Sequence, residues 1–379
     1  MKKILTLAGA LVLVAGSAWA QVGTPGDTGV GNGKAGTGNA LTGDAGASAT
    51  FKGASIDVMS DLQKAYKDYS DKKFPDAAVR LTSIVRKAPN SLPAHQMLAD
   101  IYIRQNRIKD AVPEMEQVVR LDPKDTATRG NLGVAYLQTA QYDKAVQLYQ
   151  TTLARSPKDP AVAFQLGTAL EKNGKHAEAA QAFEQAAALA PRDGRAPLYA
   201  GLLYHQTGND VKAVPNLQKA VALGAADTFS AHMVLAEIDA HAGKADAAIQ
   251  EYKLASAAKP EDFSAAANLG VLNQNAGKKM DAVAAYRQAL TLKAGTPQAQ
   301  AQVQASLAGL LAPDSPGEAA TLLTQAAQND PANAQYESAL GQTYEKQGKK
   351  DLAMAAYQKA LTLDAHQPEA TLGLARLKK

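Results

Sequence analysis

Three side chains with acid–base character lie close together at Glu237, Asp239 and His241, and His205 precedes them in the chain. Carboxylates and imidazoles hold metal ions or transfer protons as general acids and bases. Residues two apart on a helix do not share a face, so these three converge only if the helix is distorted. Two interpretations stand. One is a metal or acid–base site, which would make the protein an enzyme using Asp239 and His241. The other is a carboxylate that caps or solvates a distorted helix end.

Other catalytic motifs are missing from the sequence. The glycine-rich run from Gly29 to Gly38 follows no apolar strand and precedes no helix signal, which argues against a phosphate loop. No nucleophile elbow and no zinc-ligand spacing occur, and the chain contains no cysteine. We predict no catalytic residue, no metal ligand and no cofactor, and hence a protein that is not an enzyme.

A fixed period organises most of the chain. Prolines and alanines recur at one constant spacing. The prolines are Pro89, Pro123, Pro157 and Pro191, and the alanines are Ala77, Ala111, Ala145, Ala179 and Ala213. With small slips in the spacing, the alanines continue at Ala248, Ala282, Ala319 and Ala353. Such a period indicates stacked copies of one small unit. About nine units begin near Val58, Leu92, Thr126, Pro160, Gly194, Phe229, Phe263, Gln298 and Ala334.

Each unit reads as two amphipathic helices joined by a short turn. In the unit from Arg129 to Asp159, apolar residues recur at helical spacings on both sides of a polar turn, Gln138 to Tyr142. Later units place a glycine in this turn, where a positive φ ends the first helix, at Gly174, Gly208, Gly243, Gly277 and Gly348. Proline stops the second helix, because it lacks an amide hydrogen. Pro113 and Pro215 fall inside second helices and predict a kink or a late helix start.

The order of these markers is Leu-Gly, an aromatic three residues on, alanine followed by an aromatic after four residues, and a final proline. It resembles the tetratricopeptide repeat family, which has the same period of about 34 residues. The resemblance covers roughly residues 56 to 379. It implies an all-α fold: a right-handed superhelical α-solenoid of about nine helix-turn-helix repeats with a C-terminal capping helix from Pro368.

The first 20 residues have the layout of a cleaved signal peptide. Lys2 and Lys3 precede an apolar run of about 12 residues, which falls short of a membrane span, and a small-residue site ends before Gln21. We expect secretion across the inner membrane and a soluble, periplasmic mature chain without a transmembrane segment.

Two further regions complete the predicted organisation. Residues 21–55 are rich in glycine and small polar residues, which predicts a disordered Gly-rich linker, and residues 56–379 form the solenoid. The formal charge of +4 falls to +2 once Lys2 and Lys3 are removed, which is too weak to argue nucleic-acid binding.

In the family that the chain resembles, the first helices line a concave groove through positions 5, 9, 12 and 13 of each unit. These spacings share one helix face. The candidate partner-binding residues at these positions are Val134, Phe164, Thr168, Leu198, Leu202, His205, Met233, Glu237 and Val271. In the alternative interpretation, Phe164, Leu198, Leu202 and Met233 only pack on neighbouring helices.

The resemblance therefore predicts a non-enzymatic protein–protein interaction scaffold of the cell envelope, which binds a segment of another protein in the concave groove. Its partners would be other proteins or peptide segments of the envelope. The alternative is a structural spacer subunit of an export or polysaccharide-secretion machine.

Overall fold

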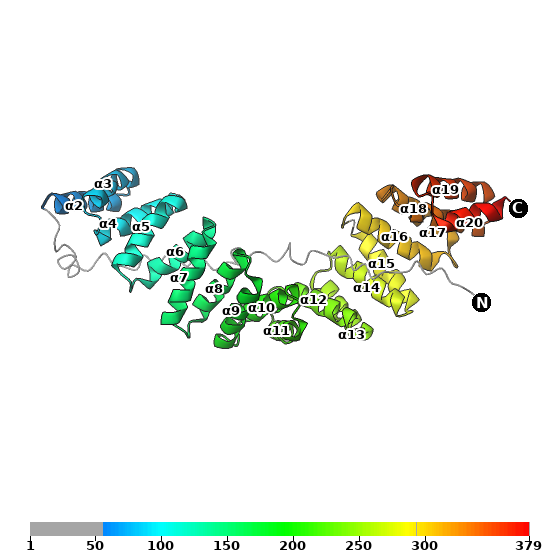
Figure 1. Cartoon of the computed structure of the whole chain (residues 1–379), viewed down its shortest axis with the longest axis horizontal. Helices are drawn as coiled ribbons and strands as arrows, with labels where there is room; N and C mark the ends of the chain where they lie inside the picture. The colour runs from blue at the N-terminus through cyan, green and yellow to red at the C-terminus, as the bar shows by residue number, and fades with distance from the viewer. Residues whose placement is uncertain (1–55, 293, 379) are drawn as a thin grey trace. The chain divides into compact units, whose positions relative to one another are not determined.

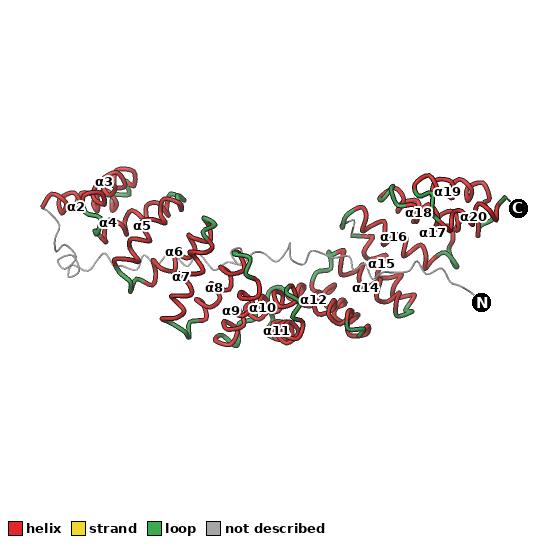
Figure 2. Tube along the Cα trace, in the orientation of Figure 1, coloured by secondary structure: helices red, strands yellow, loops and turns green. Residues whose placement is uncertain are grey.

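The computed structural model describes residues 56–292 and 294–378. All regular secondary structure in this part of the chain is helical, and short turns join the helices (Figure 2). The predicted signal peptide, residues 1–20, and the predicted linker, residues 21–55, lie outside the described residues.

The 19 helices of the described residues form nine consecutive pairs and a single last helix (Figure 1). The first helices of the pairs are α2 (Ile56–Ser70), α4 (Leu92–Arg104), α6 (Thr126–Gln138), α8 (Pro160–Lys172), α10 (Arg195–Gln206), α12 (Thr228–His241), α14 (Phe263–Asn275), α16 (Pro297–Leu311) and α18 (Ala334–Lys346). The second helices are α3 (Phe74–Lys87), α5 (Ile108–Leu121), α7 (Tyr142–Arg155), α9 (His176–Leu189), α11 (Asp210–Ala222), α13 (Ala245–Ala258), α15 (Lys279–Thr291), α17 (Pro316–Asn329) and α19 (Lys350–Leu363). The last helix is α20 (Pro368–Leu377). The prediction of an all-α repeat fold with a terminal helix is confirmed.

The chain divides into two compact units, one ending at Asn216 and the other beginning at Leu217. We call residues 56–216 the N-terminal unit and residues 217–378 the C-terminal unit. Within each unit, a helix packs mainly on the helices that precede and follow it. The repeats below are numbered from α2–α3 as repeat 1.

Small residues let the two helices of a repeat approach closely. The alanines of the periodic series have no exposed surface in the N-terminal unit, at Ala77, Ala111, Ala145, Ala179 and Ala213. On the first helix, Gly167 faces the Phe183 ring, and a Cβ there would lie 2.8 Å from a ring carbon. Tyr286 and Gly270 repeat this contact in the C-terminal unit. The Leu-Gly motif therefore makes room for the aromatic residue of the same repeat.

The turns between paired helices use the left-handed backbone conformation. The predicted glycines have positive φ angles: Gly174 76°, Gly208 76°, Gly243 73°, Gly277 72° and Gly348 73°. Repeats 1 to 3 place Lys72, Asn106 and Ala140 at the same position, with φ angles of 59°, 57° and 57°. Side chains with a Cβ are strained there, so the first three repeats keep the turn geometry without the residue that favours it.

The interior prolines do not delay their helices. α5 begins at Ile108 and α11 at Asp210, with Pro113 and Pro215 inside them. The prediction of a late helix start is therefore wrong. In α5, the buried side chains of Val112 and Met115 flank Pro113. Their packing accounts for a helix that survives the loss of one backbone hydrogen bond.

Candidate interaction face

The residue at position 9 of each repeat lies on the first helix, and its exposure falls from the first repeats to the last along the N-terminal unit. These residues, one repeat apart, are Tyr66, Asp100, Val134, Thr168 and Leu202. Tyr66 is 41% exposed and Val134 is 42% exposed, whereas Thr168 is 7% exposed and Leu202 is 2% exposed. Asp100 is half-buried and accepts hydrogen bonds from Tyr69 and Arg104. The accessible apolar side chains at this position therefore lie in repeats 1 and 3.

Phe164, at position 5 of repeat 4, joins an aromatic cluster. Its ring packs edge-to-face against Phe183 and Tyr199, with centroids 5.0 and 5.7 Å away. The Arg195 guanidinium lies over the Phe164 ring at 5.5 Å and is fixed by hydrogen bonds to Asp193. Phe164 is half-buried. It therefore packs on neighbouring helices and still presents part of its surface to solvent.

Three of the predicted groove residues have almost no accessible surface. Leu198 is 4% exposed and Leu202 is 2% exposed in the N-terminal unit, and Met233 is 1% exposed in the C-terminal unit. Met233 belongs to the core cluster that contains Tyr252 and Ala248. The exposed apolar stripe expected through the middle repeats is absent at these residues, because their side chains fill the core instead.

Thr168 is buried as well, whereas three other predicted residues are partly accessible. His205 is half-buried, and its Nδ1 lies 2.7 Å from Oδ1 of Asp210 on the next helix. Glu237 and Val271 are half-buried in the C-terminal unit. Of the nine predicted residues, four are thus buried and five are exposed or half-buried.

The acid–base cluster of the C-terminal unit has a local explanation. Asp239 lies 3.4 Å from Nζ of Lys244, across the turn that ends its own helix. His241 is exposed. Across residues 56–292 and 294–378, no group of three or more histidine, aspartate and glutamate side chains has the geometry to hold a metal ion. The ion pair with Lys244 favours the second interpretation, in which Asp239 is a polar residue at a helix end.

Accessible apolar side chains recur on the first helices of repeats 1 to 4. We call this surface the N-terminal face and define it by five residues that are exposed or half-buried, Tyr66, Ile103, Val134, Leu137 and Phe164. Val134 and Phe164 are the two of these five that belong to the predicted partner-binding residues, and Leu137 stands at position 12 of its repeat, another position predicted to face the groove. Applying the repeat register to the first two repeats would have identified Tyr66 and Ile103.

A three-residue tie fastens the repeats that carry this face. Glu116 on α5 accepts a hydrogen bond from the Tyr136 hydroxyl on α6, at 2.7 Å, and one from Lys144 on α7, at 2.9 Å. The ammonium of Lys144 also lies over the Tyr136 ring at 5.4 Å. Burial tends to raise the pKa of the Glu116 carboxyl, but these donors outweigh burial and lower it. The tie joins repeat 2 to repeat 3.

The same tie recurs two repeats later. Glu184, Tyr204 and Lys212 occupy the equivalent positions and make the same hydrogen bonds and ring contact. The pKa of Glu184 is lowered for the same reason, against the effect of burial. Between the two ties, repeat 4 has Leu170 in place of the tyrosine. The two ties are therefore separated by a joint that has no tie.

None of the helices among the described residues combines the length and the apolar character needed to span a membrane.

Family comparisons agree with the helix pairs. Tetratricopeptide repeat models match residues 69–127, 107–166, 164–227 and 338–367. The chain belongs to the tetratricopeptide repeat family. Proteins of this family are generally protein–protein interaction scaffolds. No curated protein sequence matches the chain.

Three solved structures are similar to parts of the chain. The C-terminal part of a repeat protein from Cytophaga hutchinsonii is 18% identical, with a TM-score of 0.50 over 64% of this chain and 98% of that one. YrrB, described as a TPR protein with an unusual peptide-binding site, is 21% identical, with a TM-score of 0.38 over 45% of this chain and 88% of that one. The Cut9–Hcn1 assembly is 17% identical, with a TM-score of 0.38 over 80% of this chain, which spans 59% of that chain's length.

Proposed function

We propose that this protein is a non-enzymatic scaffold of the cell envelope that binds an extended or helical segment of a partner protein on its N-terminal face. The observation that carries the proposal is the exposure of Tyr66 and Val134 at the same position of two repeats of one unit. Half-buried Ile103, Leu137 and Phe164 extend the apolar surface between and beside them. Apolar side chains gathered on one surface favour contact with another protein.

The face also has fixed polar groups that limit what it can bind. Asp100 and Arg104 lie in repeat 2 and are paired with each other. A strongly charged partner segment would therefore find these two counter-charges already paired, whereas apolar side chains spaced along a segment would meet Tyr66 and Val134. We expect the partner segment to be predominantly apolar on the side that contacts the scaffold.

A crosslinking experiment tests this surface directly. A photoreactive residue at Val134 is expected to crosslink to one defined segment of an envelope protein, and Val134→Glu to abolish capture of that segment. Val79 on α3 is the matched control, because it is 74% exposed but lies on a second helix. Equal crosslinking from positions 134 and 79 would rule out the N-terminal face as the binding surface.

Location in the envelope rests on the sequence of residues 1–20. A protein recovered from the periplasm should begin at Gln21, as read by N-terminal sequencing. An uncleaved chain recovered only from the cytoplasm would contradict the envelope assignment while leaving the binding face open to test with cytoplasmic partners.

The second candidate is a structural spacer subunit of an export or polysaccharide-secretion machine. The ties at Glu116 and Glu184 favour it, because they fasten successive repeats and stiffen the unit. A spacer tolerates charge on the N-terminal face, so full activity of a Tyr66→Glu and Val134→Glu double variant in cells would favour the spacer.

A further inference from the structure

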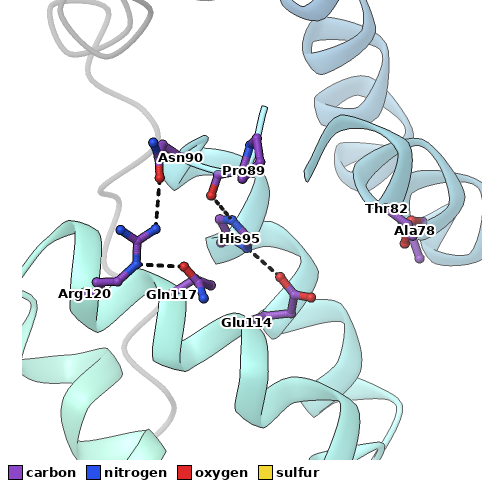
Figure 3. A network of polar contacts seen from close by, with 8 residues as sticks. All are labelled: Ala78, Thr82, Pro89, Asn90, His95, Glu114, Gln117 and Arg120. Atoms are coloured by element: carbon purple, nitrogen blue, oxygen red, sulfur yellow. Dashed lines mark hydrogen bonds and ion pairs between the residues drawn. The ribbon is translucent and has the colours of Figure 1, made fainter. Parts of the chain in front are cut away.

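A buried histidine joins the first two repeats. His95 on α4 is 5% exposed, and both nitrogens of its ring contact oxygen atoms (Figure 3). Nδ1 lies 2.6 Å from Oε2 of Glu114 on α5, and Nε2 lies 3.0 Å from the carbonyl oxygen of Pro89. Pro89 stands in the loop between α3 and α4. His95 therefore holds the connection between repeats 1 and 2 to the second helix of repeat 2.

The geometry specifies the charge of the ring. A carbonyl oxygen and a carboxylate oxygen only accept hydrogen bonds, so each ring nitrogen must carry a proton to bond both. A neutral imidazole has one N–H and would turn the lone pair of its other nitrogen toward an oxygen. With Glu114 as the carboxylate, only the imidazolium ion satisfies both contacts.

The next repeat makes the same contact with a permanent cation. Arg129 occupies the position of His95 one repeat later, is 7% exposed, and donates to the carbonyl oxygen of Pro123. Pro123 in turn occupies the position of Pro89 one repeat later. A guanidinium stays charged across the physiological pH range, whereas an imidazolium loses its proton near neutrality.

A second buried histidine shows that the charge is not required at every repeat. His232 has the same repeat position in the C-terminal unit and lies 2.7 Å from Glu251. Among the described residues, Glu251 is the one hydrogen-bond partner of its ring. One N–H suffices for that contact, so a neutral ring satisfies it.

We propose that the joint between repeats 1 and 2 is a pH-sensitive joint, closed while His95 is protonated and loosened when it loses its proton, whereas the Arg129 joint is independent of pH. This goes beyond the proposed scaffold role and does not depend on a bound partner. It matters for the N-terminal face because repeat 1 carries Tyr66.

The charged groups around His95 are Glu114 and Arg120, both from α5. Burial lowers the pKa of the His95 imidazole, but the hydrogen bonds to Glu114 and the Pro89 carbonyl and the charge of Glu114 outweigh burial and the opposing charge of Arg120, so the pKa lies above its ordinary value of 6.5. Arg120 itself donates to Asn90 and Gln117 at 2.9 Å each (Figure 3). The bond to Asn90 does not involve the His95 proton and keeps the loop attached to α5 when the His95 contacts weaken, so the joint loosens without detaching.

The direction of the effect follows from proton linkage. Because the folded joint holds the His95 proton more tightly than the open joint, its stability is complete below pH 6.5 and falls as the pH rises through the folded pKa. Between the two pKa values, the equilibrium constant for closing falls by up to about tenfold per pH unit, the limit for one proton.

Hydrogen exchange on the full chain tests the proposal. After correction for intrinsic exchange, the amides of α2 and α3 should lose protection between pH 6 and pH 8.5 in the wild type. His95→Arg should remove this loss, and Arg129→His should create a new loss that extends through α4 and α5. Wild-type and His95→Arg chains with the same pH dependence would overturn the proposal.

A titration of the ring gives a second, independent measurement. The His95 ring resonances should titrate above pH 6.5 in the wild type and at a lower pH in Glu114→Gln, which removes the carboxylate charge but keeps a hydrogen-bond acceptor. A His95 titration that is unchanged by Glu114→Gln would show that the pair does not hold the proton, and the joint would then not respond to pH in the way proposed.

Discussion

Val134 and Leu202 occupy the same position of repeats 3 and 5, yet Val134 is 42% exposed and Leu202 is 2% exposed. The difference begins one turn earlier on each helix. Gly130 precedes Val134 and adds no side chain beside it, whereas buried Leu198 precedes Leu202 and packs next to it. Position in a repeat therefore fixes where a side chain points, and its neighbours decide whether it reaches solvent.

The largest effect should come from shortening the buried member of this pair. Leu202→Ala removes core contacts and leaves a cavity, so we expect a loss of about 2–5 kcal/mol. Val134→Ala changes an exposed side chain and should stay within about 0.5 kcal/mol. Urea unfolding followed by circular dichroism measures both. Equal losses for the two variants would show that the exposure difference is not real in solution.

Glycines at two positions of the first helix extend the comparison to the backbone. Gly167→Ala would place a Cβ 2.8 Å from the Phe183 ring, so we expect a loss of about 1–3 kcal/mol as the ring shifts. Gly130→Ala meets no atom within 4 Å and should stabilise its helix by about 1 kcal/mol, because alanine favours helix over glycine. The same unfolding measurement serves, and losses in both variants would contradict the packing role assigned to Gly167.

The repeat pattern predicted the fold because it depends on residues whose local physics is strong. Proline stops, small residues at the helix contact and glycine turns such as Gly174 each constrain the backbone wherever they occur. The left-handed conformation of Lys72, Asn106 and Ala140 escaped prediction because it is imposed by the two packed helices and not by the residue itself. Tertiary packing supplies there what the local sequence lacks.

The candidate face was harder to predict than the fold. Helical spacing correctly placed Leu198 and Met233 with Val134 at the first-helix positions, but spacing carries no information on the side chains of adjacent helices. The His95 joint was missed for a similar reason, since a histidine, a proline carbonyl and a glutamate at 95, 89 and 114 meet only after the helices pack. The comparison with Arg129 in the next repeat is the sequence signal that could have revealed it.

Turn residues give a smaller contrast at one repeat position. Ala140 holds a φ of 57°, which costs a residue with a Cβ about 1–2 kcal/mol. Ala140→Gly should therefore stabilise repeat 3 by about 1 kcal/mol, after the entropy that glycine adds to the unfolded chain. Gly174→Ala should destabilise repeat 4 by a similar amount. Thermal unfolding with matched buffers measures both, and two changes of the same sign would disprove the role of the turn.

The smallest predicted effect is a loss of stability in acid. It should occur at the two joints that carry a tie and not at the joint between them. Glu116 and Glu184 have lowered pKa values, because donation from Tyr136, Lys144 and their counterparts outweighs burial. Their contribution is present above the ordinary carboxyl pKa of 4.5 and is lost as the pH falls through the lower folded value. Both carboxylates are partly exposed, so each tie should contribute less than about 1 kcal/mol.

The first helix of repeat 4, which lies at the joint without a tie, should respond to acid with the opposite sign. Burial raises the pKa of Glu171 on α8, although the charges of Lys172 and His176 oppose it, so protonation favours the folded state there as the pH falls. Hydrogen exchange followed from pH 7 down through the lowered pKa values of Glu116 and Glu184 should therefore show α6 and α10 losing protection while α8 keeps or gains it. Glu116→Gln should remove the loss at α6 and leave α10 unchanged. A uniform loss along all three helices would mean that acid acts on the unit as a whole, and that the two ties do not set the local stability of the repeats.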